Sequence, residues 1–178
     1  VLEKLDSGKI TNISDEMSLS QKDIEESTTI VSQIGIAPII ELLKQKADVI
    51  LCGRACDTAI YAAPCIYNGY NPGLAFHMAK IMECGAMCSE PVAAADVMQA
   101  YMYDDYFELR PANPIRKCTV DRVAAHTLYE QSNPYLIFEP DGVCDLTYSK
   151  FQQVDERTVR VTGSVFKEAE EQTLKLEG

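Results

Sequence analysis

The predicted fold rests on the stretch Ala47-Asp48-Val49-Ile50-Leu51-Cys52-Gly53-Arg54-Ala55-Cys56-Asp57-Thr58. Val49 to Cys52 is a wholly apolar run that ends at Gly53, which is typical of a strand buried on both faces of a parallel sheet. A helix from Thr58 to about Tyr67 follows, and Asp57 occupies the position of its N-cap. The stretch therefore predicts a central buried strand, a glycine turn and a capped helix.

The turn after this strand is the first candidate binding site. In open α/β sheets ligands bind at the carboxyl ends of the strands, and helix N-termini favour anions. Gly53 and Arg54 stand at that point, and a guanidinium group matches a carboxylate or a phosphate. The alternative is structural: Gly53 forms the turn, and Arg54 pairs with a carboxylate on the surface.

The flanking segments favour helices. Ser20 and Asp23 are spaced for a capping box, and the loosely helical pattern that follows ends at Gly35. Pro38 suits the first turn of the next helix, which runs into the predicted strand at Asp48. Beyond the strand, a helical pattern covers about Leu74 to Ser89.

Lys80 and Glu83 share one face of that last helix. They form either an exposed ion pair or a base and an acid that face the glycine turn. The length of the helix, roughly 20 Å at about 1.5 Å per residue, allows its middle to reach the turn. We therefore predict that Arg54, Asp57, Lys80 and Glu83 converge on one crevice.

The second half of the chain is rich in predicted strands. Residues 100–103 and 106–109 indicate a hairpin, and a basic loop follows from Arg110 to Lys117. Thr119 begins a helix, and alternating segments at 135–138, 143–147, 151–154 and 159–165 predict further strands. We expect one α/β domain over residues 1–178: a helix-rich half with a partly parallel sheet (1–98), a β-rich half (99–166) and a charged tail (167–178).

Composition excludes several classes of partner. Acidic residues outnumber basic ones 27 to 16, and the net charge of −11 disfavours nucleic acid and anionic membranes as partners. No signal peptide or membrane-spanning run is present, so we read the 7 cysteines as reduced thiols of a cytoplasmic protein. The start at Val1 predicts a fragment of a longer protein.

Two cysteine pairs at a spacing of four, Cys52 with Cys56 and Cys84 with Cys88, raise the question of a zinc site. We predict no metal, because Cys52 falls in the expected strand and Cys56 in the turn after it. Cys84 as a nucleophile beside His77 or His126 is a second alternative, against which stands ordinary core packing.

Several motifs resemble the acyclic terpene utilisation (AtuA-like) family over about Ile30 to Phe166. They are Ala47 to Asp57, Glu83-Cys84-Gly85-Ala86, Leu128-Tyr129-Glu130, Val143-Cys144-Asp145 and Arg160-Val161-Thr162-Gly163-Ser164. The resemblance implies a cytoplasmic catabolic protein that handles branched acyl compounds as coenzyme A thioesters, and members are longer than this chain. No bound cofactor is expected; the CoA thioester would be the substrate.

The glycine turn, the helix face of Lys80 and the matched motifs together give the candidate residues. Catalysis would fall to Asp57, Lys80 and Glu83. Contacts with an acyl or carboxylate ligand would come from Gly53, Arg54, Arg110, Asn113, Arg116, Tyr129 and Asp145. The chain departs from the family at two points. Lys80 stands where many members have histidine, and a lysine is a poor base at neutral pH unless it is desolvated. Arg116 and Lys117 would replace a glycine-rich loop, which weakens the expectation of a shared phosphate site.

Three hypotheses of function remain. The first is an enzyme domain that acts on a carboxylate or an acyl-CoA. The second is a non-catalytic subunit or scaffold of an acyl-CoA degrading assembly that docks through the apolar hairpin. The third is a module that binds an acyl ligand. The missing N-terminal portion and further copies of the chain are the expected protein partners.

Overall fold

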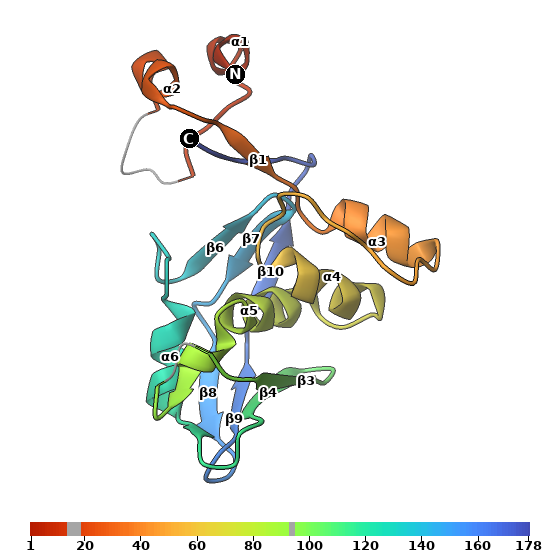
Figure 1. The fold of residues 1–178 in the computed structure, drawn as a ribbon, viewed down its shortest axis with the longest axis vertical. Helices are drawn as coiled ribbons and strands as arrows, with labels where there is room; N and C mark the ends of the chain where they lie inside the picture. The colour runs from red at the N-terminus through yellow and green to blue at the C-terminus, as the bar shows by residue number, and fades with distance from the viewer. Residues whose placement is uncertain (14–18, 93–94) are drawn as a thin grey trace.

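Helix α5 (Pro72–Met82) occupies the centre of the molecule (Figure 1). The computed structural model describes residues 1–13, 19–92 and 95–178. Every residue of α5 from Gly73 to Ile81 is buried. The helix begins where the Asn71 side chain accepts hydrogen bonds from the backbone N–H groups of Gly73 and Leu74, with Pro72 in the first turn. It is covered by a sheet on each of two sides.

The first sheet has four antiparallel strands in the order β3-β4-β9-β8. Their bounds are Met98–Met102 (β3), Tyr106–Pro111 (β4), Val159–Thr162 (β9) and Lys150–Gln153 (β8). The β3–β4 pair is the predicted hairpin, which is confirmed. Leu74, Met78 and Ile81 of α5 pack into one core cluster with Phe107 and Val161 of this sheet.

The second sheet has three antiparallel strands in the order β10-β7-β6. Their bounds are Val165–Glu168 (β10), Gly142–Asp145 (β7) and Leu136–Glu139 (β6). Phe76 of α5 stacks on Phe166 with ring centroids 4.5 Å apart. Helices α3 (Ala37–Lys44) and α4 (Ala59–Tyr67) complete this second core. Both helices were predicted, including Pro38 in the first turn of α3.

Smaller elements close the two ends of the molecule. They are α1 (Leu2–Asp6), α2 (Gln21–Glu26), β1 (Val31–Gln33), η1 (Gly85–Cys88), β2 (Ser89–Glu90), β5 (Lys117–Cys118), α6 (Val120–Thr127) and β11 (Lys175–Glu177). The capping box of Ser20 and Asp23 is confirmed, but its helix ends at Glu26. The segment up to Gly35 instead contains β1, which pairs with β11 of the charged tail.

The prediction of a central strand at Val49 to Cys52 is wrong. Val49 is 85% exposed and Leu51 95% exposed, while Ile50 and Cys52 pack against the core. No strand includes this segment, and every sheet among the described residues is antiparallel, so the partly parallel sheet is also wrong. A single parallel bridge joins Ile34 to Ala55. The segment is an extended loop in which alternate residues face inward, and a four-residue apolar run does not distinguish this from a strand buried on both faces.

Asp57 does not cap α4, contrary to the prediction. The N-cap is Thr58, whose backbone is already helical (φ −64, ψ −30) and whose side chain makes no capping bond. Side-chain capping needs an extended backbone at the cap, and the tight turn before α4 does not provide one. The long helix predicted to reach Ser89 ends at Met82, and η1 follows it as a separate 3₁₀ turn. Among the described residues, no helix is both long and apolar enough to span a bilayer.

Candidate functional site

Lys80 and Glu83 form a buried ion pair at the C-terminal end of α5. Their side chains are 7% and 8% exposed, and Lys80 Nζ donates to Glu83 Oε1. The alternative of an exposed surface pair is therefore wrong. Residues three apart lie on the same face of a helix, so Lys80 and Glu83 are neighbours. Because that face of α5 is covered by the rest of the fold, both side chains are buried.

An aromatic pair at the end of α6 covers the lysine. Lys80 Nζ lies 5.9 Å from the centre of the Tyr129 ring, within the range of a cation–π interaction. The Tyr129 ring stacks on His126, with ring centroids 5.4 Å apart and an angle of 20° between the ring planes. Burial lowers the pKa of His126, which keeps that ring neutral beside the cation. Tyr129 is thus the predicted ligand-binding residue that the fold brings to Lys80.

Asp57 lies close enough to act on this pair electrostatically. Helices α4 and α5 are packed neighbours joined by a short turn, so the start of α4 meets the end of α5. Burial raises the pKa of Glu83, Lys80 opposes that effect, and the charges of Asp57 and Glu130 raise the pKa further. The predicted catalytic residues Asp57, Lys80 and Glu83 therefore share one electrostatic neighbourhood.

Glu139, at the end of β6, is a titratable group that the sequence reasoning missed. Its Oε1 accepts a hydrogen bond of 2.8 Å from the Thr58 hydroxyl. Burial raises the pKa of Glu139 to about 7, and the charges of Glu83 and Asp141 act in the same direction. A glutamate at the end of a strand follows no sequence pattern that marks it as functional. Glu130, whose charge also acts on Glu83, could have been identified from the sequence, because it belongs to the Leu128-Tyr129-Glu130 motif.

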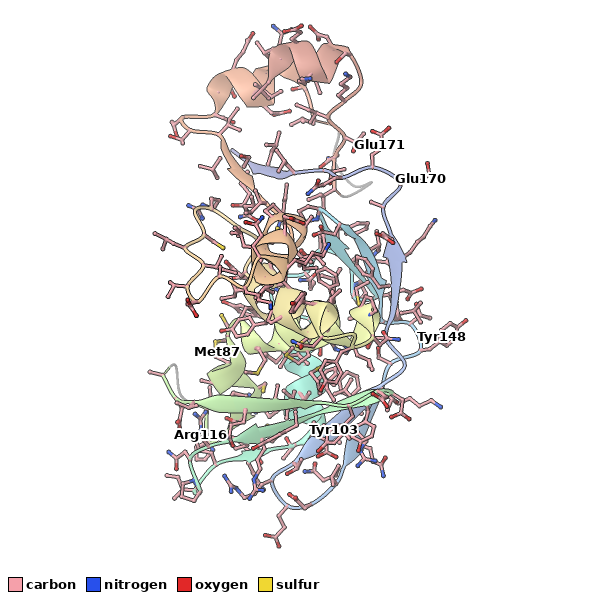
Figure 2. All side chains as sticks on the ribbon, turned by 90° about the vertical axis from the view of Figure 1, so that its right-hand side faces the viewer. Met87, Tyr103, Arg116, Tyr148, Glu170 and Glu171 are labelled. Atoms are coloured by element: carbon pink, nitrogen blue, oxygen red, sulfur yellow. The ribbon has the colours of Figure 1, made fainter. Side chains whose placement is uncertain are left out.

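A hollow of about 1370 Å³ borders Glu139. Its lining residues come from α1, α2, the end of β6, β11 and the segments beside them. Much of its wall is apolar, from Ile10, Ile13, Leu19, Ile24, Ile30, Phe138, Leu174 and Leu176. Lys4, Lys9 and Lys175 add positive charge, and Glu171 lies on the segment leading to β11 (Figure 2). The arrangement provides apolar space beside an acid that titrates near neutrality.

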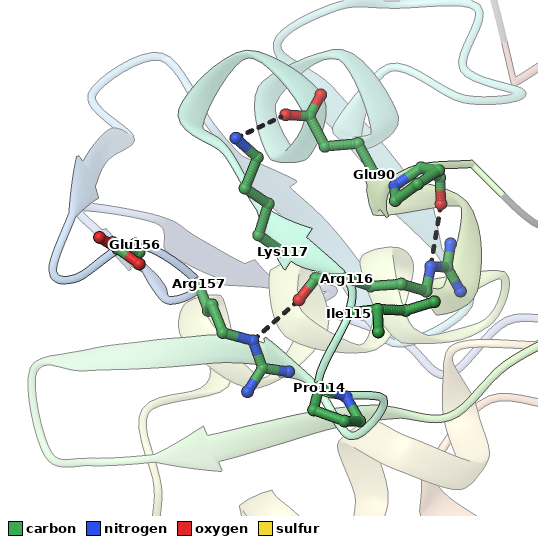
Figure 3. A pocket seen from close by; sticks show the side chains of 8 residues that line it. Glu90, Pro114, Ile115, Arg116, Lys117, Glu156 and Arg157 are labelled. Carbon is green, nitrogen blue, oxygen red and sulfur yellow. Dashed lines mark hydrogen bonds and ion pairs between the residues drawn. The ribbon is translucent and has the colours of Figure 1, made fainter.

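A second hollow, of about 510 Å³, contains the predicted loop residue Arg116 (Figure 3). The Arg116 guanidinium is buried and donates to the carbonyls of Pro91 and Ala86 at 2.9 and 2.7 Å. Its Nη1 also lies 2.9 Å from Asp96 Oδ2, to which the Asn113 side chain donates as well. Arg116 and Asn113 are thus engaged in holding the loop together.

The remaining predicted ligand contacts, all of them described residues, form no hydrogen bond or ion pair with Lys80 or Glu83. Gly53 and Arg54 are exposed in the loop, and the Arg54 side chain has no hydrogen bond or ion pair with any described residue. Arg110 is exposed at the end of β4. Asp145 accepts from the backbone N–H of Thr147 at 2.8 Å, where it stabilises a turn. The structure therefore joins Asp57, Lys80, Glu83 and Tyr129, and it does not bring Arg54 into contact with them.

The cysteines considered as metal ligands or as a nucleophile have the following surroundings. Within residues 1–13, 19–92 and 95–178, no group of three or more His, Cys, Asp or Glu side chains is arranged to hold a metal ion. Burial and the charge of Glu83 raise the pKa of Cys84, which opposes thiolate formation. His77 is occupied by Ser164 and Thr127, at 2.7 and 3.1 Å, and so is not free to act as a base for Cys84.

Comparison with known families agrees with the sequence motifs. The family described as "Acyclic terpene utilisation family protein AtuA" matches residues 1–104 and 111–178. The chain belongs to this AtuA family. The match includes the Lys80–Glu83 pair, Asp57, Tyr129 and Glu139. No curated protein and no solved structure shows significant similarity to this AtuA chain.

Proposed function

We propose that this AtuA-family chain binds a branched acyl compound, as a carboxylate or a CoA thioester, and transfers a proton at the site formed by Lys80, Glu83 and Glu139. The observation that carries the proposal is the position of Glu139. It lines the apolar hollow of about 1370 Å³ and is close enough to Glu83 to feel its charge. Family membership supports a role in acyclic terpene utilisation.

The hollow supplies the environment that an acyl group requires. Ligand pockets are mainly apolar with a few placed polar groups, and this wall has both. The apolar part of the ligand would lie against Ile24, Ile30 and Phe138. Its polar end would then point towards Glu139, with Lys175 as a counter-charge for a carboxylate.

The raised pKa values of Glu139 and Glu83 support a role in proton transfer. A general acid or base works best when its pKa lies near the operating pH, and that of Glu139 is about 7. Glu83 is the second acid, kept beside Lys80 so that the charge of the site stays balanced. The Tyr129 ring lies 5.9 Å from Lys80 Nζ, where it would stabilise the cation during proton transfer.

Substitution of Glu139 tests this proposal. Binding and turnover would be measured with a panel of branched carboxylates and their CoA thioesters, on the wild type and on Glu139→Gln. We expect turnover to fall by about 10²–10⁴-fold with a smaller change in ligand affinity, because a general acid–base contributes to the chemical step. Glu171→Gln is the matched control, since Glu171 lines the same hollow but is exposed. Equal turnover in both variants would contradict the role of Glu139.

Arg54 would serve as an outer contact for the anionic end of a CoA ligand. Its guanidinium is exposed and without a partner among the described residues, so it is free to bind phosphate. Arg54→Ala should weaken binding of the CoA thioester and leave binding of the free carboxylate unchanged. Loss of both in titration calorimetry would place Arg54 at the acyl end instead.

A docking subunit is the second candidate, and the edge strand β3 favours it. Val97, Tyr101 and Tyr103 are 62%, 45% and 40% exposed at or beside this strand, and the Tyr103 ring stacks on that of Tyr106 in β4. Co-purification from cell extract that depends on Tyr101 and Tyr103, together with no turnover of any acyl ligand, would favour this function over the enzyme.

A further inference from the structure

The edge strand β3 of the four-stranded sheet carries no charge. The stretch from Val97 to Tyr103 is uncharged throughout, although the chain as a whole has a net charge of −11. The other outer strands of the two larger sheets each contain a charged residue: Lys150 in β8, Glu139 in β6 and Lys167 in β10. Charges on an edge strand oppose pairing with another chain, so β3 is the edge that lacks this protection.

The hydrogen bonds between β3 and β4 show which backbone groups of β3 are in use. The Val97 carbonyl accepts from the Ala112 N–H, and the Tyr103 N–H donates to the Tyr106 carbonyl, both at 2.9 Å. In an antiparallel pair, every second residue of a strand directs its N–H and C=O to the neighbouring strand. The odd-numbered residues of this segment therefore bond to β4.

Met98, Ala100 and Met102 consequently direct their N–H and C=O groups towards the free edge of the sheet. In the part of the chain that the structure describes, no other segment supplies a hydrogen bond to these groups. The side chains of the same three residues pack against the core, which holds the strand in place from behind. The edge is thus a fixed row of unpaired donors and acceptors, which is what an added strand requires.

A second copy of β3 fits this edge about a twofold axis at Ala100. In that antiparallel register, Ala100 exchanges two hydrogen bonds with Ala100 of the other copy, and Met98 pairs with Met102. The unpaired groups of both strands are then satisfied together. Because both copies present the same patch, the pair closes on itself and adds no further strand.

The same register matches the exposed side chains of the segment. Val97, Tyr101 and Tyr103 are 62%, 45% and 40% exposed. Pairing sets Val97 against Tyr103 of the other copy, and Tyr101 against Gln99. Each exposed side chain is therefore covered by a residue of the partner, and cross-strand neighbours of this kind stabilise a sheet.

Electrostatics also favour this surface for self-association. Two copies of an acidic protein repel each other over most of their surfaces, and the uncharged segment is a place where they can approach. At the ends of the pairing, Asp96 would stand opposite Asp104. Arg116 Nη1 lies 2.9 Å from Asp96 Oδ2 and offsets that repulsion.

We propose that the chain forms a symmetric homodimer in which the two β3 strands pair antiparallel about Ala100. The two four-stranded sheets then form one continuous sheet across both copies. The inference does not depend on the acyl site, and it assigns to β3 a second copy of this chain in place of a different protein.

Paired charge substitutions test the proposed register. Sedimentation equilibrium of the purified chain would be recorded from about 1 µM to about 1 mM, the range of weak association. We expect the mass of the wild type to rise from that of one chain towards that of two. Gln99→Lys with Tyr101→Lys sets like charges opposite each other across the axis, and it should weaken the dimer about tenfold or more. Gln99→Glu with Tyr101→Lys sets opposite charges there and should recover that loss.

The control is Gln152→Lys, which adds a lysine to β8 at the other edge of the same sheet and should dimerise like the wild type. Circular dichroism of each variant would confirm that it remains folded. A wild type that stays monomeric over the whole range, or two charge variants of equal affinity, would overturn the proposal.

Hydrogen exchange followed by NMR gives a readout at single residues. The amides of Met98, Ala100 and Met102 should exchange more slowly as the protein concentration rises, because only the dimer provides their partners. Those of Gln99 and Tyr101 bond to β4 and should be protected equally at every concentration. A dimer that forms without this alternation would associate through another surface, which would also overturn the proposal.

Discussion

Lys80 keeps a full charge inside the protein through one carboxylate and one aromatic face. Moving two charges out of water costs free energy that their attraction does not always repay, so a buried pair is weak evidence of a purely stabilising role. The cost of breaking such a pair is large, because the remaining charge has no partner. The pair is therefore open to a direct test of stability.

Lys80→Met should destabilise the protein by about 3–5 kcal/mol, because it leaves the Glu83 carboxylate buried and unpaired. The double variant Lys80→Met with Glu83→Met should recover most of that loss. Lys22→Met is the control, since Lys22 pairs with Glu26 at the surface with both side chains at least 69% exposed. Urea unfolding at pH 7 measures all three, and a small effect of Lys80→Met alone would contradict the buried pairing.

His77 is the centre of a directional chain of hydrogen bonds. The Thr127 hydroxyl donates to the carbonyl of Val123 at 3.0 Å, so it accepts from His77 Nε2–H. Nδ1 is then unprotonated and accepts from the Ser164 hydroxyl, which is 2.7 Å away. Burial lowers the pKa of His77 from 6.5 to about 3, which makes the neutral ring the form that the fold requires.

This depressed pKa predicts a specific loss of stability in acid. The unfolded chain binds a proton at His77 below pH 6.5, whereas the folded chain does so only near pH 3. The contribution is therefore complete above pH 6.5 and declines as pH falls towards 3. At about pH 4.5 the wild type should have lost roughly 2–3 kcal/mol relative to His77→Gln, at about 1.4 kcal/mol per pKa unit. Parallel stability curves from pH 7 to pH 4.5 would refute the assignment.

At the scale of elements, α5 approaches the turn between β9 and β10 more closely than a side chain allows. A Cβ at Gly73 would lie 2.5 Å from the carbonyl oxygen of Ser164, and the Cys144 thiol donates to the carbonyl of Gly73. Gly53, in contrast, has no heavy atom within 4 Å of such a Cβ and no positive φ.

Gly73→Ala should therefore cost about 1–3 kcal/mol, because the backbone of β10 must move away from the helix. Gly53→Ala is the matched change in open space, and it should be neutral or stabilising by up to about 1 kcal/mol. Thermal unfolding compares the two. A larger loss of stability in Gly53→Ala than in Gly73→Ala would contradict this expectation.

The start of α3 is stabilised by a carboxylate from a distant element. Asp141, in the turn between β6 and β7, accepts from the backbone N–H of Ile36 at 2.9 Å. Asp141→Ala should destabilise the protein by about 0.5–2 kcal/mol, as loss of a helix cap does. Asp57→Ala, which removes the cap predicted for α4, should change stability by less than about 0.5 kcal/mol. A larger loss of stability in Asp57→Ala than in Asp141→Ala, measured by chemical denaturation, would indicate that Asp57 does cap α4.

The sequence was sufficient to predict those helices and strands that depend on residues close to each other in the chain. The capping box at Ser20, the proline at the start of α3, the β3–β4 hairpin and the helix begun by Thr119 all appear as predicted. The failures concern partners that are distant in sequence. Whether Val49 to Cys52 becomes a strand depends on a neighbour to pair with, and Asp141 acts on Ile36 across the fold. Burial of the Lys80–Glu83 pair and the proximity of Glu139 likewise arise only from packing.

At the scale of the whole molecule, the β1–β11 ribbon fastens the N-terminal segment to the C-terminal one. It has three residue pairs, Val31 with Glu177, Ser32 with Leu176 and Gln33 with Lys175. A two-stranded pair of this size is marginal by itself in water. The ribbon also forms part of the wall of the larger hollow, so its opening would open the proposed acyl site.

Hydrogen exchange should therefore be faster for the amides of residues 31–33 and 175–177 than for those of α5. Local opening is cheapest where few buried contacts are lost, and α5 is buried from Gly73 to Ile81. A branched acyl ligand that occupies the hollow should slow exchange in the ribbon and leave α5 unchanged. Ribbon amides that exchange as slowly as those of α5 without ligand would contradict this expectation.

The central position of α5 also determines how the protein unfolds. One side of the helix gives Phe76 and Ala79 to the core with the three-stranded sheet, and the other gives Leu74, Met78 and Ile81 to the core with the four-stranded sheet. Neither core remains complete if the helix leaves it. The two sheets should therefore melt as a single cooperative unit, and a substitution that damages one core should lower the melting temperature of both.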